Sequence, residues 1–176
     1  MSENIDEVEA DRKSRRKAKI CGDIALGATV ITGAMLVVYH LRRPPFADHY
    51  EGGFALLVSI ASYTVELFAA LIATKILSRS ALALRIALAG IVLGALFSFV
   101  YIVWFPHKGS DVAGLAGVIY GIFIALSVTV FSAVISIVIL VRSPTQWSKT
   151  ATLSALIGVV AIPILFVTYE FLKPGL

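Results

Sequence analysis

One acidic residue stands in the middle of a long apolar run. Glu66 is the thirteenth of the 24 residues FALLVSIASYTVELFAALIATKIL, whose one other charged residue, Lys75, lies near the end of the run. A charged acid at the centre of a bilayer costs about 2.5–3.5 kcal/mol on insertion scales. Burial also favours the neutral form of a carboxyl group. We therefore predict that Glu66 faces other helices and is protonated.

The residues that share a helix face with Glu66 are small or polar. Ser62 and Tyr63 precede it by four and three residues, and Ser59 by seven, so these four side chains form one intramembrane polar site. The carboxyl either bonds a neighbouring helix, or binds a proton or cation on a conduction path, or contacts a partner protein. We favour the first interpretation, because a proton relay needs more than one titratable group.

The three histidines form a second, weaker set of candidates. His40, His49 and His107 all fall on the side predicted to face outward, together with several acids. Imidazole and carboxylate groups are the usual ligands of Zn²⁺, but no metal-ligand spacing links these residues. We predict solvated polar residues here, with no metal site and no cofactor.

The composition indicates which kind of fold must position these groups. Of the 176 residues, 59% are hydrophobic and 15% are charged, whereas soluble domains are nearer 45–50% and about 25%. The apolar residues are also gathered into long segments. The sequence therefore predicts an all-α integral membrane helix bundle, in contact with the lipid bilayer.

About 20 apolar helical residues cross a bilayer. Five segments reach that length, and the loops between them are short: Ile20–Leu41, Phe54–Leu77, Ile86–Phe105, Val112–Val141 and Ala151–Leu172. We expect residues 20–176 to form a single transmembrane domain after a polar cytoplasmic tail, residues 1–19. For the tail, a disordered segment is favoured over a charged helix lying on anionic lipid.

The distribution of basic residues predicts the orientation. With the N-terminus inside, eleven of the fifteen Lys and Arg residues lie in the cytoplasm and four lie outside, as the positive-inside rule requires. We therefore predict a multi-pass protein of the plasma (inner) membrane, with a cytoplasmic N-terminus and an outward C-terminus. The net charge of +4 comes largely from this topological signal, so nucleic acid is not an expected partner.

Small residues recur along the later spans. Gly90 and Gly94, and likewise Gly117 and Gly121, form G-x-x-x-G pairs, which allow close helix contact in lipid. These faces serve either packing within the bundle, which is favoured, or a partner subunit. Pro163 interrupts the fifth span and removes one backbone hydrogen bond there.

No catalytic or nucleotide-binding motif is present, and one buried glutamate does not make an active site, so we do not expect an enzyme. The favoured function is a small multi-pass protein that binds another membrane protein. It would be an accessory subunit of a membrane complex, or an immunity-type protein against a pore-forming toxin. The alternative is a small oligomeric channel or transporter with Glu66 on its conduction path.

Overall fold

Five helices make up the computed structural model, which describes residues 3–41, 49–104, 111–143 and 149–172. Side chains are described over 8–39, 54–103, 116–143 and 149–169. The helices are α1 (Glu3–Leu41), α2 (His49–Ser78), α3 (Leu82–Trp104), α4 (Asp111–Arg142) and α5 (Lys149–Leu172). The predicted all-α fold is confirmed, and each predicted span corresponds to one helix.

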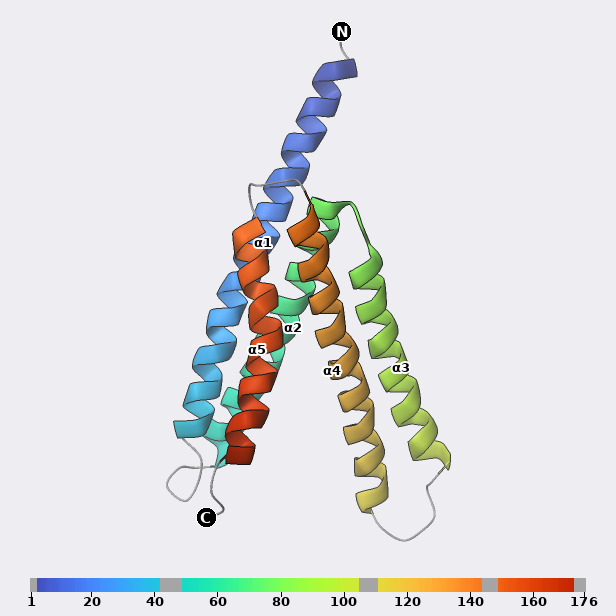
Figure 1. The fold of residues 1–176 in the computed structure, drawn as a ribbon. Helices are drawn as coiled ribbons and strands as arrows, with labels where there is room; N and C mark the ends of the chain where they lie inside the picture. The colour runs from blue at the N-terminus through green and yellow to red at the C-terminus, as the bar shows by residue number, and fades with distance from the viewer. Residues whose placement is uncertain (1–2, 42–48, 105–110, 144–148, 173–176) are drawn as a thin grey trace.

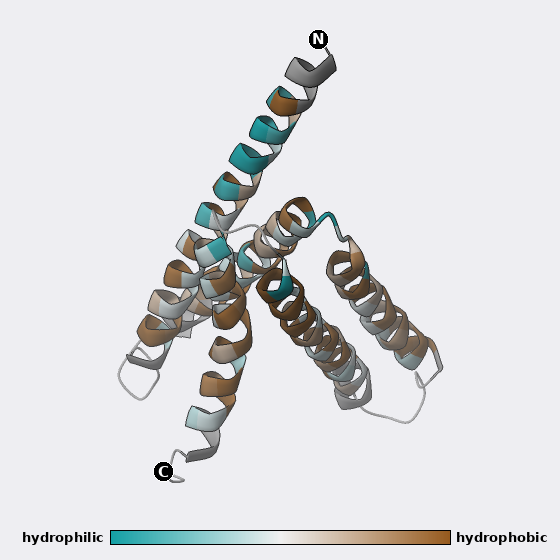
Figure 2. Cartoon of the chain, turned by 45° about the horizontal axis from the view of Figure 1, so that its top comes forward, coloured by the Kyte–Doolittle hydropathy of each residue, from teal (hydrophilic) through white to brown (hydrophobic). Residues whose placement is uncertain are grey.

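All five helices are long and apolar enough to cross a membrane. Large apolar side chains cover their outward faces, among them Phe54, Leu57, Phe99 and Leu165. Figure 2 shows that the spans are mostly hydrophobic, while the amino-terminal part of α1 is mostly hydrophilic. The buried core is instead rich in alanine. Such a distribution suits a bundle surrounded by lipid, in which small residues allow helices to approach.

The amino-terminal segment differs from the disordered tail favoured from sequence. Helix α1 has 39 residues, which makes it about 58 Å long, and its first half projects from the bundle (Figure 1). Two ion pairs of i,i+4 spacing line this projection: Glu9–Lys13 at 3.4 Å and Asp11–Arg15 at 2.8 Å. The membrane span supplies a ready helical nucleus, so the polar residues extend an existing helix rather than starting one.

The helices associate as two units, which contact each other along one side. Helices α1 and α2 form the most extensive helix contact, and α5 lies against both of them. Helices α3 and α4 form a hairpin, which meets the three-helix unit mainly through α4. In Figure 1 the two units converge at the end from which α1 projects and diverge toward the opposite end.

Glycine allows the hairpin helices to approach closely. A Cβ atom added to Gly94 would lie 2.5 Å from the carbonyl oxygen of Gly121, and one added to Gly121 would lie 2.5 Å from that of Gly94. Gly90 similarly faces Val128, and Gly117 faces Tyr101. All four glycines predicted as a packing or partner face therefore lie where α3 meets α4.

Candidate functional site

Glu66 lies where α1, α2 and α5 meet, and its side chain is 0% exposed. The Oε1 atom is 2.8 Å from the hydroxyl of Thr29 on α1. On the α5 side, a Cβ atom added to Gly158 would lie 2.7 Å from Oε1. The glycine thus leaves room for the carboxyl group beside the backbone of α5. Glu66 faces protein, as the cost of placing an acid in lipid requires.

Burial and the second oxygen of Glu66, which is unpaired within the described part of the chain, favour a neutral acid. The Thr29 hydroxyl also lies 3.0 Å from the carbonyl oxygen of Ala25, and one hydroxyl donates only one proton. The Thr29 proton is therefore shared between the Ala25 carbonyl and Glu66 Oε1. Glu66 Oε2 is buried with no hydrogen-bond partner among the described residues. A carboxylate would leave a charged oxygen unpaired there, which is costly.

Hydroxyl groups join α1 and α2 one turn from Glu66. Thr32 Oγ1 and Ser62 Oγ are 2.8 Å apart and connect the two helices. Ser59, by contrast, donates to the carbonyl oxygen of Ala55 in its own helix at 2.8 Å. Of the predicted polar site, Ser62 and Glu66 therefore contact α1, whereas the hydroxyl of Ser59 is satisfied within α2.

Tyr63 compensates for a proline in α5. Pro163 lies inside that helix and has no N–H, so the carbonyl of Val159, four residues earlier, loses its helical donor. The Tyr63 hydroxyl donates to this oxygen at 2.9 Å. A side chain of α2 thus replaces the backbone bond that the proline removes, and it ties α2 to α5.

Sequence reasoning found Glu66, Ser62 and Tyr63 but missed their partners Thr29, Thr32 and Val159. The proline identifies Val159 through the four-residue spacing, yet nothing in the sequence says which helix supplies the donor. The histidine candidates lie outside the described side chains: His40 and His49 are described by backbone only, and His107 falls in 105–110. The interpretation of these three residues stays a prediction.

Helix α4 carries a second feature, a line of residues that we call the seam. Successive members are alternately four and three residues apart along the helix: Leu140, Ser136, Ala133, Thr129, Leu126, Ile122 and Ile119. The first four, the closed half, are 0–5% exposed. Leu126, Ile122 and Ile119, the open half, are 41%, 53% and 46% exposed. One helix face is therefore buried near Arg142 and uncovered toward the opposite end.

The fold and these contacts define a multi-pass, α-helical membrane protein. Comparisons with protein-family models, curated proteins and solved structures gave no match. The function is therefore argued from residues and geometry.

A double-mutant cycle tests the link between Tyr63 and Pro163. We predict that Tyr63→Phe lowers the free energy of unfolding by about 1–2 kcal/mol, because the Val159 carbonyl is left unpaired. With Pro163→Ala present, the loss should fall to less than half, since Ala at this position restores the helical N–H. Denaturant unfolding in mixed micelles measures both, with the exposed Tyr120→Phe as the control. An equal loss in both backgrounds would contradict the pairing.

Substitutions of Glu66 separate a structural role from an ionic one. Glutamine keeps the size and hydrogen-bonding capacity of a neutral acid, so we predict that Glu66→Gln changes unfolding free energy by less than about 0.5 kcal/mol. Glu66→Leu removes the contact with Thr29 and should cost roughly 1–2 kcal/mol or less. A large destabilisation by glutamine would argue that the ionised carboxylate is the form that the bundle requires.

Proposed function

We propose that this protein acts by binding another membrane protein, and that a transmembrane helix of the partner docks on the open half of the seam. The protein is then an accessory subunit of a membrane complex or an immunity-type protein against a pore-forming toxin. Both kinds of partner would present a helix within the bilayer. The observation that carries the proposal is the change from buried to exposed along one continuous face of α4.

The spacing of the seam supports a helical partner. Alternation of four and three residues is the pattern by which two helices pack side by side at a small crossing angle. In the closed half, Ala133 and Ser136 are fully buried, and Ala133 belongs to the core cluster that also contains residues of α2 and α5. In the open half, the large side chains of Ile122 and Leu126 continue the same face and are about half exposed.

Exposure alone would not support this proposal. Lipid tails are as apolar as leucine, so an uncovered isoleucine in the bilayer has no strong drive toward protein. Continuity supports it, because the open half extends a packing surface that the chain already uses. The G-x-x-x-G pairs do not compete for this role, since they lie at the contact of α3 with α4.

Glu66 has a structural role in this proposal. Its contacts with Thr29 and the Gly158 backbone join three helices, which keeps the unit that flanks the seam in one arrangement. The transport alternative remains distinguishable by experiment. Ion flux in proteoliposomes that is lost in a stable Glu66→Gln variant would favour transport over partner binding.

We further propose that the end from which α1 projects lies in the cytoplasm and that the membrane is the plasma (inner) membrane. Eleven of the fifteen Lys and Arg residues then lie inside, in line with the positive-inside rule. The C-terminus lies on the outer side. A carboxy-terminal reporter that is active only in the cytoplasm would contradict this orientation.

Photo-crosslinking in native membranes tests the partner. A photoreactive amino acid at Ile122 should give one protein adduct of defined mass, and adding Ile119→Ala and Leu126→Ala should lower its yield several-fold. The matched control is the same probe at Leu93, which is 56% exposed on α3 and off the seam. That control should give lipid adducts without a defined protein adduct.

Two outcomes would contradict the proposal. Lipid adducts alone at Ile122 would mean that the open half faces only the bilayer. An adduct of twice the mass of the chain would mean that a second copy, rather than a different protein, covers the seam.

A further inference from the structure

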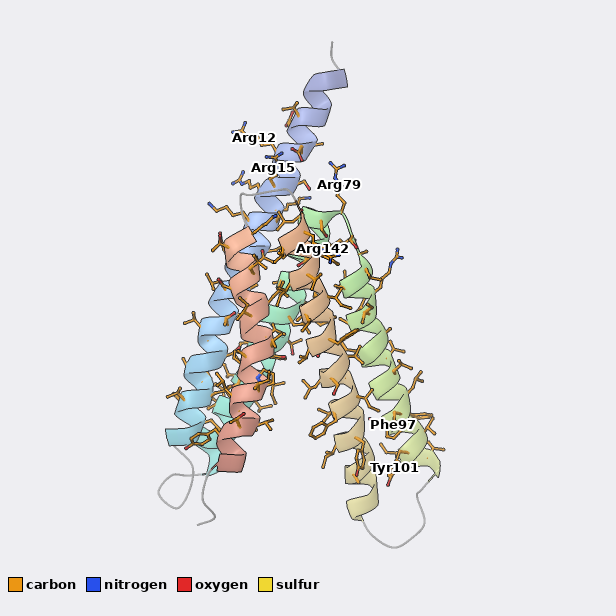
Figure 3. The ribbon with its side chains drawn as sticks, in the orientation of Figure 1. Arg12, Arg15, Arg79, Phe97, Tyr101 and Arg142 are labelled. Carbon is orange, nitrogen blue, oxygen red and sulfur yellow. The ribbon has the colours of Figure 1, made fainter. Side chains whose placement is uncertain are left out.

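Cations from every helix gather at the end from which α1 projects. Figure 3 shows Arg79 and Arg142 there, with Arg12 and Arg15 farther out on α1. The six cations nearest the bundle, which we call the basic ring, are Lys19, Lys75, Arg79, Arg85, Arg142 and Lys149. All except Lys149 are exposed.

Contacts between the helices place several of these cations at one level. Gly22 on α1 touches Thr152 on α5, where an added Cβ would lie 2.8 Å from the threonine hydroxyl. Both helices run in the same direction (Figure 1), so Lys19 and Lys149, each three residues earlier, lie at a similar height. The Lys149 ammonium donates to the carbonyl of Ser143, next to Arg142. Charge from α1, α4 and α5 therefore meets at one depth.

The projecting part of α1 adds cations just above the ring. Lys13 and Arg15 are paired with acids, but Arg16 and Lys17 have no acid three or four residues away along the helix. Arg16 lies about 4.5 Å above Lys19 along the axis, and Arg12 about 10 Å above it. The headgroup layer is about 5–7 Å thick on each side of the hydrocarbon core, so it reaches Arg16 but not Arg12.

We propose that the basic ring, with Arg16 and Lys17, binds the phosphate groups of anionic phospholipids. Guanidinium and ammonium groups form charge-assisted hydrogen bonds with phosphate oxygens, and an anionic leaflet attracts cations within a Debye length. The acids near the start of α1, including Glu9 and Asp11, lie farther out and are repelled by the same surface, whereas Asp23 lies one turn below Lys19. Because the cations lie at the base of the projection and the acids lie near its tip, the base contacts the lipid surface while the tip points away from it. This inference is independent of the partner at the seam.

Spin-labelled lipids in proteoliposomes test the proposal. We expect the wild-type protein to select phosphatidylglycerol over phosphatidylcholine, and we expect high salt to weaken that selection. A proximal triple variant, Arg16→Gln with Lys17→Gln and Lys19→Gln, should lower the relative association constant roughly tenfold or more, because each nearby cation contributes up to about fivefold. A proximal double variant, Arg16→Gln with Lys17→Gln, should lower it several-fold. The matched distal double variant, Arg12→Gln with Lys13→Gln, removes the same charge from positions about 9–10 Å above Lys19 and should change it less than about twofold.

Equal association of both lipids with the wild type would overturn the proposal, and so would equal losses in the two double variants. The second result would mean that net charge alone attracts the lipid. If the proximal variant does not insert correctly, Arg79→Gln with Arg142→Gln tests the ring and leaves α1 unchanged. That double variant should also reduce the selection for phosphatidylglycerol. An unchanged selection would contradict the proposal that the basic ring binds anionic phospholipid.

Discussion

The hydrogen bond from Tyr63 to the carbonyl of Val159 shows the constraint on which the three-helix unit depends. Within a bilayer no water can pair with the carbonyl that Pro163 frees, so the protein must supply the donor. Helix α2 does so, and the bond holds α2 and α5 in one register. The Glu66 carboxyl and the Thr32–Ser62 pair join α1 to the same helix. Satisfying buried polar groups therefore specifies how α1, α2 and α5 sit together.

The hairpin of α3 and α4 depends on close packing instead. Gly94 and Gly121 bring the two backbones together, and a side chain at either position would meet a carbonyl oxygen. Helix α4 belongs to both parts of the molecule, because its closed half packs on the three-helix unit while its glycines face α3. The small residues of the closed half determine where the two units converge. The open half is left where they diverge, and this is the surface to which we assign partner binding.

Much of the fold could be predicted from the sequence, because the cost of polar groups in lipid leaves few alternatives. Five apolar segments predicted five helices, and Glu66 could be placed inward from the penalty for exposing it. The partners of Glu66 could not be predicted, since helical periodicity identifies a face but not the helix opposite it. The contact with Thr29 and the space at Gly158 depend on tertiary arrangement. For residues 3–19 a helix was the less favoured of two predictions, because composition alone does not show that the membrane span supplies a helical nucleus for the polar residues.

The spacing of the seam is present in the sequence, but its division at Thr129 is not. That division depends on where α2 and α5 meet α4, and partner binding at the open half depends on it. Oxygen accessibility of spin labels along α4 in bilayers measures the division directly, in a Cys21→Ser background because Cys21 is the one native cysteine. For the isolated protein, we predict high accessibility at Ile119, Ile122 and Leu126, and low accessibility at Ala133, Ser136 and Leu140. Uniformly low accessibility along the whole seam would contradict the account, because the chain itself would then cover the surface assigned to a partner.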